Sequence, residues 1–152
     1  CRAGTDTPFS YGGLDTIFSQ HANMADITVK LMAVRGVNPK PMKNPNRAYD
    51  FELKDPRSDD NALLLSIAGS YRPNPWGLYD MHGNAAEWTR SDYKPYPYKA
   101  ADGRNRGEPN TKKVLRGGSW HDRPFRCTSS FRLGFPTWHR VYHAGFRVIV
   151  EE

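Results

Sequence analysis

Residues 74–89, NPWGLYDMHGNAAEWT, constrain the backbone more than any other segment of the 152-residue chain. Large apolar side chains alternate here with Gly, Asn, Asp and Glu, so the segment fits neither a simple helix nor a simple strand. Gly83-Asn84 is a strong reversal signal because both residues tolerate positive φ. We expect a sharply turned loop that is anchored in the core by Leu78 and Tyr79 before the turn and by Trp88 after it.

This loop also carries candidate metal ligands. Asp80 and Glu87 place two carboxylates on it, and the carbonyl groups of Gly83 and Ala85 are free to point inward. Oxygen ligands on a short, sharply turned loop suit a hard cation such as Ca²⁺. The alternative is that the two carboxylates accept hydrogen bonds from loop amides.

Three ordered segments resemble the formylglycine-generating-enzyme (sulfatase-modifying factor) family. They are GLYDMHGNAAEW at 77–88, VLRGGSW at 114–120 and GFRV at 145–148, and the opening CRAGT also looks like a motif of that family. The resemblance implies an irregular, loop-rich α+β fold of C-type lectin-like kind, with short strands and few helices. It implies a single bacterial-type domain over residues 1–152 that lacks its N-terminal part.

The resemblance extends the metal prediction. It places a carboxylate or amide ligand and a neighbouring carbonyl ligand at Asn23-Met24 and at Asp60 and Ala62, which together form a second candidate site. It also favours calcium over simple hydrogen bonding at the loop of Asp80 and Glu87. Residues 35–59 are longer than the corresponding family segment and rich in Pro and charge, so we expect a surface-loop insertion there.

Enzymes of this family hold Cu(I) with two cysteines that follow the Gly-Gly-Ser-aromatic block, and soft thiolate ligands suit Cu(I). In this chain the block ends at Ser119-Trp120, and Asp122 occupies the first cysteine position. Cys127 occupies the second position in an ungapped match and is an ordinary core cysteine in a gapped one. Ser119, Asp122 and Cys127 are therefore the candidate catalytic residues. Ala86, where catalytic members carry Trp, is a further departure.

The formal charge of +6 is concentrated late in the chain, with eight Lys/Arg and one acid between Lys112 and Val150. Such a basic face can meet nucleic acid or an acidic polymer. The interpretation that we prefer is that these Arg side chains bridge loops. Tyr93, Tyr96 and Tyr98 alternate with prolines and are suited to stacking on sugars or bases, but packing of a Pro-rich turn is the interpretation that we prefer.

Other features set broader bounds. No apolar run is long enough to span a bilayer. Cys1 and Cys127 allow one disulfide at most and do not settle the compartment, although an extracytoplasmic location is favoured. A chain that begins with Cys is explained by a missing N-terminal part, and a lipid-modified Cys1 is the competing explanation. The His139–His143 spacing, His121 and His82 offer candidate iron ligands, for which surface or hydrogen-bonded histidine is the preferred interpretation.

Three functions follow. The first is a degenerate, non-catalytic module that binds a protein or peptide, or alternatively a glycan, through calcium-stabilised loops; a nucleic acid partner is not expected. The second is a formylglycine-generating oxidase with altered copper ligation. The third is a structural subunit of a larger assembly. Asp122 in place of a cysteine argues for the first.

Overall fold

The structure is a computed structural model that describes residues 1–28 and 55–150. Its regular part is one sheet of four short strands in the order β3-β2-β1-β4. The strands are β1 (Ala86–Asp92), β2 (Lys112–Arg116), β3 (Leu133–Pro136) and β4 (Ala144–Phe146). Two 3-10 turns have their bounds within the described residues, η2 (Ala100–Asp102) and η3 (Pro124–Cys127), and Ile27 and Thr28 also have 3-10 conformation.

The two central strands hold the sheet together. β1 and β2 are antiparallel with Trp88 opposite Leu115, and the register shifts between Trp88 and Asp92. β3 extends the sheet antiparallel to β2, whereas β4 runs parallel to β1 on the other edge. Val114 and Leu115 on β2 are buried. The apolar pair Val114-Leu115 ahead of Gly117-Gly118 predicts a strand that runs into a tight turn, and β2 confirms the strand.

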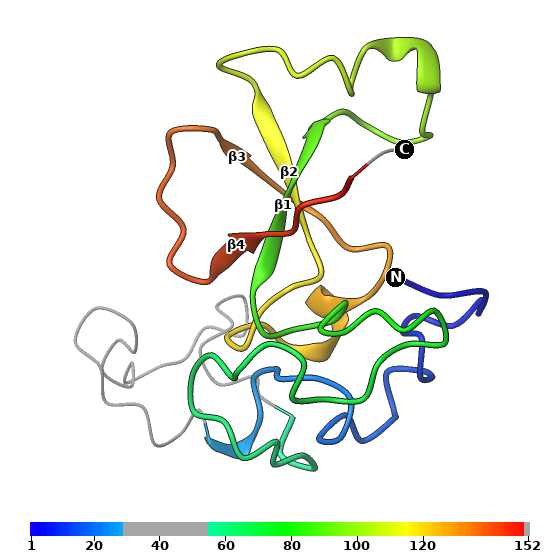
Figure 1. Cartoon of the computed structure of the whole chain (residues 1–152), viewed down its shortest axis with the longest axis vertical. Coiled ribbons are helices and arrows are strands. Elements are labelled where there is room, and N and C mark those ends of the chain that lie inside the picture. The colour runs from blue at the N-terminus through cyan, green and yellow to red at the C-terminus, as the bar shows by residue number, and fades with distance from the viewer. Residues whose placement is uncertain (29–54, 151–152) are drawn as a thin grey trace, which may run out of the picture.

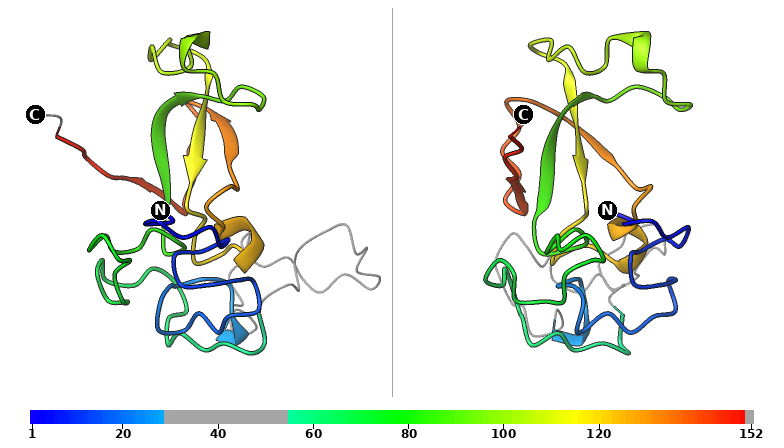
Figure 2. Two further views of the ribbon diagram at one scale, coloured as in Figure 1. Left: turned by 90° about the vertical axis from the view of Figure 1, so that its right-hand side faces the viewer. Right: turned by 45° about the vertical axis from the view of Figure 1, so that its right-hand side comes forward.

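Below the sheet, the chain is almost entirely irregular. Residues 1–28 and 55–85 wind around one end of the sheet, and the long connection between β1 and β2 lies at the other end (Figures 1 and 2). A core cluster joins four side chains of residues 1–28 to the last residue of η3: Phe9, Phe18, Ala22, Met24 and Cys127. A few large side chains therefore carry the burial, as expected for a chain rich in Gly and Pro.

Two turns fix how the irregular part joins the sheet. Gly83 and Asn84 have φ of 76° and 60°, which confirms the reversal expected there. Gly118 has φ of 67°, and a β-carbon at this position would approach the Cα of Cys127 to 2.9 Å. The backbone carbonyl of Gly117 accepts a hydrogen bond from the amide of Gly83 at 2.9 Å. The two turns are thus bonded to each other.

Three local expectations need correction or fall outside the described residues. Leu78 and Tyr79 do not anchor the loop in the core, since they are 40% and 43% exposed. The sequence alternation predicts a short strand at 27–34, but of these residues the structure describes only Ile27 and Thr28, which have 3-10 conformation. The insertion at 35–59 is described only from Asp55 onward.

The alternation of Phe146, Val148 and Val150 with Arg147 predicts a C-terminal core strand over residues 145–150, and this prediction is wrong. β4 ends at Phe146, and Phe146, Val148 and Val150 are 79%, 76% and 84% exposed. The alternation is present, but Arg147 is the residue that turns toward the protein, where it bonds to Glu87. After β4 the chain leaves the sheet and runs away from the body (Figure 2).

No helix in the described ranges, 1–28 and 55–150, is long and apolar enough to cross a membrane.

Candidate functional site

The loop between Asp80 and Glu87 is held by carboxylate contacts at both ends. Oδ2 of Asp80 accepts the amide of Gly69 at 2.7 Å, while Oδ1 is buried without a hydrogen-bond partner. The carboxylate of Glu87 accepts N–H groups of Arg147 at 2.6 Å and 3.0 Å, and the same guanidinium donates to the carbonyl of Tyr79 at 2.9 Å. The unpartnered oxygen of Asp80 fits a cation, whereas Arg147 competes with one for Glu87.

A pocket of about 470 Å³ opens beside this loop. It brings together Asp80, Ala85 and Glu87 of the first candidate calcium site, but Gly83 does not line it. The remaining walls come from the turn at Ala68-Gly69 and from the end of β4. The sequence analysis did not single out Arg147. The alternation of polar and apolar residues in GFRV is a signal for it, if the polar position is taken as the one that faces the protein.

The second candidate site is also assembled in space. Oδ2 of Asp60 accepts the amide of Met24 at 3.0 Å, and Oδ1 accepts the amide of Ala62 at 2.9 Å. Asn23 is 1% exposed, yet its Oδ1 has no hydrogen-bond partner. Burial raises the pKa of Asp60 to about 6, and the neighbouring charge of Asp26 adds to this rise. A buried orphan oxygen beside buried carboxylates is an arrangement that a cation would stabilise.

Asp26 and Asn84 were missed by the sequence reasoning. Asp26 is fully buried and accepts hydrogen bonds from the amides of Thr28 and Asp60 at 2.8 Å and 2.7 Å. The side chain of Asn84 accepts from the amide of Ser66 and from Nδ2 of Asn23, at 2.9 Å and 3.2 Å. These contacts join the two candidate calcium sites into one hydrogen-bonded unit.

Within residues 1–28 and 55–150, no group of three or more His, Cys, Asp or Glu side chains is arranged to hold a metal, so backbone and amide oxygens would have to contribute.

The three candidate catalytic residues do lie together, but their contacts do not fit a copper site. Oγ of Ser119 donates to Oδ2 of Asp122 at 2.6 Å, and both residues are buried. Cys127 is 0% exposed, and its Sγ lies 3.9 Å and 3.8 Å from the carbonyls of Ser119 and Asp122. Burial raises the pKa of the Cys127 thiol well above its usual value, and the charge of Asp122 raises it further. Cu(I) requires an accessible thiolate, and this site offers a buried thiol opposite a carboxylate.

Cys1 is also a free thiol, whose Sγ donates to Oγ of Ser129 at 3.2 Å.

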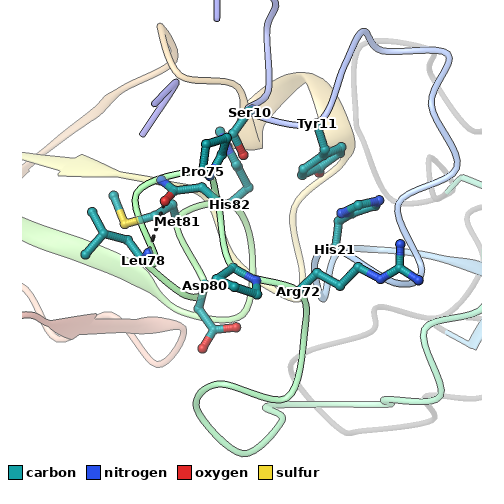
Figure 3. Close-up of a pocket in the computed structure, with 11 residues that line it drawn as sticks. Ser10, Tyr11, His21, Arg72, Pro75, Leu78, Asp80, Met81 and His82 are labelled. Carbon is teal, nitrogen blue, oxygen red and sulfur yellow. Dashed lines mark hydrogen bonds between the residues drawn. The ribbon is translucent and has the colours of Figure 1, made fainter. Parts of the chain in front are cut away.

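His82 has a structural position. Its Nε2 accepts the amide of Ser10 at 3.2 Å, so Nδ1 carries the proton and donates to the carbonyl of Cys127 at 2.8 Å. Burial lowers the pKa of this imidazole and keeps it neutral. Figure 3 shows His82 on the wall of a pocket of about 210 Å³, with Tyr11, His21 and Arg72 on one side and Leu78 and Met81 on the other.

The other histidines do not converge on one point. His139 lies in the loop between β3 and β4, where a four-residue spacing does not place side chains on one helical face, and its ring stacks on Phe135 at 5.0 Å. His121 and His143 are neighbours with ring centroids 6.2 Å apart. Burial lowers the pKa of His143, while the charge of Asp122 opposes that shift.

The comparisons with known proteins decide the family. Residues 30–152, which are most of the chain, match the Sulfatase-modifying factor enzyme 1-like domain (FGE-sulfatase). The chain belongs to this family. The sulfatase-modifying-factor domain thus accounts for the ordered motifs at residues 77–88, 114–120 and 145–148.

Sequence relatives match about half of the chain. It is 37% identical over 82 residues to inactive C-alpha-formylglycine-generating enzyme 2 of Mus musculus and 38% identical to the Bos taurus protein of the same name. Each match covers 51% of this chain and 23% of the relative. Serine/threonine-protein kinase pkn1 of Chlamydia pneumoniae is 41% identical over 74 residues, which are 45% of this chain and 12% of the kinase. The chain thus matches less than a quarter of each relative's length.

Solved structures show the fold. PvdO from Pseudomonas aeruginosa superposes with a TM-score of 0.63 at 24% identity, over 95% of this chain and 46% of that one. Treponema denticola variable protein 1 superposes with a TM-score of 0.62 at 20% identity, over 95% and 41%. The irregular, loop-rich α+β fold of C-type lectin-like kind, with short strands and few helices, is confirmed.

Proposed function

We propose that this sulfatase-modifying-factor domain is a non-catalytic module that binds a protein or peptide partner through calcium-stabilised loops. The observation that carries the first half is the state of Cys127. A fully buried thiol whose pKa is raised cannot supply an accessible thiolate. The carboxylate of Asp122 already accepts a hydrogen bond from Oγ of Ser119. The mammalian relatives that carry the word inactive in their names support the same conclusion.

The loops support the second half of the proposal. They have little regular backbone pairing, and their conformation depends on buried polar side chains such as Asn23, Asp26, Asp60 and Asn84. Two of the oxygens at the candidate sites, Oδ1 of Asn23 and Oδ1 of Asp80, are buried without partners. Ca²⁺ bound by these oxygens would supply charge that offsets the buried carboxylates and would fix the loops.

The pocket beside Glu87 supplies a surface for a partner. Tyr79 and Phe146 line it and are 43% and 79% exposed. Aromatic side chains of this kind contribute much of the binding energy in protein interfaces. A partner side chain in this pocket would lie against the loop that the first candidate calcium site holds.

The copper prediction is tested by titrating the reduced protein with Cu(I) while O₂ consumption is followed with a cysteine-containing sulfatase-motif peptide. We expect neither tight one-to-one binding nor peptide oxidation, and Cys127→Ser should behave as the unmodified protein. Tight copper binding that Cys127→Ser removes, together with peptide oxidation, would establish the oxidase with altered ligation instead.

The calcium prediction is tested by thermal unfolding of two variants that separate Glu87 from its ion-pair partner. Glu87→Ala should lose most of the rise in Tm that Ca²⁺ produces, whereas Arg147→Ala should keep that rise, since it frees the carboxylate for the cation. Both variants lose the same ion pair, so both should show a similar small loss in chelator, about 0.5–1 kcal/mol for a partly exposed pair. A calcium-dependent rise that is the same in Glu87→Ala as in the unmodified protein would exclude Glu87 as a ligand.

A further inference from the structure

Three tyrosine rings project from the connection between β1 and β2. Tyr93, Tyr96 and Tyr98 are 43%, 57% and 56% exposed. The connection that carries them lies at the end of the sheet opposite residues 55–85 (Figure 1). The prolines between them fix the backbone dihedral φ and so limit how far this segment can rearrange. The rings therefore form a solvent-facing feature, and packing within a Pro-rich turn does not account for their exposure.

Arg132 lies between two of these rings. Its guanidinium carbon is 4.8 Å from the ring centroid of Tyr93 and 3.9 Å from that of Tyr96. In the described part of the chain, Arg132 has neither a carboxylate partner nor a hydrogen bond. The guanidinium carbon lies over two ring faces and no described carboxylate or carbonyl engages the group, so the N–H groups along its edge remain available. That edge is the part of a guanidinium that pairs with a carboxylate through two parallel hydrogen bonds.

The surroundings hold this arrangement in place. A β-carbon at Gly134 would collide with the ring of Tyr93, so the missing side chain on β3 makes room for that ring. At the other end, the guanidinium of Arg104 lies 4.7 Å from the centroid of Tyr98 and bonds to Asp102 at 2.5 Å. A preorganised set of rings and charge loses little conformational entropy when a partner binds.

The charge of this region is strongly positive. Between Arg90 and Lys113 there are seven Lys/Arg and three acids, and Arg132 adds a further cation. Two of the three acids are already paired, Asp92 with Lys113 and Asp102 with Arg104. The side chains of Lys99, Arg106 and Lys112 are exposed. The surface thus carries excess positive charge around exposed aromatic rings.

We propose that Tyr93, Tyr96, Tyr98 and Arg132 form a docking surface for an acidic peptide segment of a protein partner. A Glu or Asp of the partner pairs edge-on with Arg132, while apolar or aromatic side chains pack on the outer faces of the tyrosine rings. Tyr and Arg are the residue types that dominate the energetics of protein interfaces. This surface is separate from the calcium loops, so it stands or falls independently of the function proposed above.

Charge complementarity favours an acidic peptide over a nucleic acid here. A nucleic acid needs a line of unpaired cations along its phosphates. In this region Arg104 and Lys113 are neutralised by carboxylates and are not free to serve a phosphate chain. One edge-presenting guanidinium between rings suits a single carboxylate better than a phosphate chain.

The test is fluorescence anisotropy of the full chain with a short, labelled Glu-Tyr repeat peptide. The matched Gln-Tyr peptide, an oligo-dT strand and a polyuronate oligosaccharide serve as comparison probes. Variants are Tyr96→Ala, Tyr96→Phe and Arg132→Ala, with Arg140→Ala as the control that removes one exposed positive charge from the loop between β3 and β4. Tyr96→Ala changes an exposed loop side chain, so it keeps the test decisive even if Arg132→Ala fails to fold.

We expect the Glu-Tyr peptide to bind more tightly than the Gln-Tyr peptide. Binding should weaken about tenfold in Tyr96→Ala and in Arg132→Ala, and remain within about twofold in Tyr96→Phe and Arg140→Ala. Equal weakening in Arg140→Ala would mean that net charge alone attracts the peptide, and the proposal would be wrong. Tighter binding of oligo-dT or polyuronate with the same dependence on Tyr96 would also overturn it, as would the absence of binding to any probe.

Discussion

At the scale of single residues, Gly118 shows how closely the chain packs behind the Gly-Gly turn. Its φ of 67° is unfavourable for other residues, and a β-carbon would also meet the Cα of Cys127 and the carbonyl of Arg126 at 2.9 Å and 3.0 Å. Gly107 has a similar φ of 76° but nothing within 4 Å. The two positions therefore separate the cost of the dihedral angle from the cost of the collision.

We predict that Gly118→Ala lowers the free energy of unfolding by more than about 3 kcal/mol, because both costs apply. Gly107→Ala should lose only about 1–2 kcal/mol, the cost of the left-handed conformation. Urea unfolding of both variants measures the difference. Similar losses in the two variants would show that the chain behind Gly118 relaxes freely.

A second prediction concerns the ion pair of Asp102 with Arg104. The hydrogen bonds from Arg104 lower the pKa of Asp102 from 3.8 to about 2. A carboxyl whose pKa is lowered by folding stabilises the protein above pH 3.8, and this contribution is lost as the pH falls toward 2. The Tm difference between the unmodified protein and Asp102→Asn should therefore be full at neutral pH and shrink between about pH 4 and pH 2. A difference that stays constant down to pH 2 would contradict this, and Asp6→Asn is the exposed control.

At the scale of elements, the central and edge strands differ in what they bury. Leu115 on β2 is 1% exposed, whereas Val148 beyond β4 is 76% exposed. We predict that Leu115→Ala costs about 2–5 kcal/mol of unfolding free energy, while Val148→Ala stays within about 0.5 kcal/mol. Chemical denaturation of both variants checks this. A large loss in Val148→Ala would restore the expectation of a C-terminal core strand.

The same elements show what the sequence could predict. β2 and the turn after it were predictable, because the apolar pair Val114-Leu115 is followed after one residue by Gly117-Gly118. The three ordered motifs also identified the family. The resemblance supplied the residues of both candidate calcium sites, and their role as ligands stays a prediction. The catalytic candidates were likewise placed together, at Ser119, Asp122 and Cys127.

Other features could not be predicted from local patterns. The sequence pattern predicted that the apolar side of residues 145–150 faces the core, whereas Arg147 faces the protein. Arg147 does so because it forms an ion pair with Glu87, and that contact depends on the parallel pairing of β4 with β1. Asn84 was recognised as a turn residue, but its bonds to Ser66 and Asn23 join segments distant in the sequence. The position of Arg132 between two tyrosine rings is likewise set by the pairing of β3 with β2.

At the scale of the whole molecule, the protein has a regular half and an irregular half. The sheet is stabilised by its ladder of backbone hydrogen bonds, whereas residues 1–28 and 55–85 depend on scattered turns and on buried polar side chains. Local stability follows such differences, and segments with little regular pairing open most easily. Under the calcium proposal, a bound cation would act mainly on the irregular half.

We therefore predict that chelator accelerates amide hydrogen exchange in residues 20–28 and 55–87 and leaves the amides of β2 almost unchanged. Calcium at about 100 times its dissociation constant should add about 2.7 kcal/mol of stability. Hydrogen exchange with mass-spectrometric detection resolves the two regions. Magnesium in place of calcium is the control, since a site built from irregular loop oxygens suits the larger ion. Equal effects on both halves would indicate global destabilisation instead of a local site.

The parallel pairing of β4 with β1 also bears on how the chain reaches this structure during synthesis. β1 can pair with β2 early, but its other edge stays open until the whole segment from Glu87 to His143 has been made and β4 arrives. Contacts between segments so far apart form late and slowly. An unpaired strand edge is also a template for wrong partners, so a ribosome-bound chain that ends before Ala144 is the species most prone to aggregate.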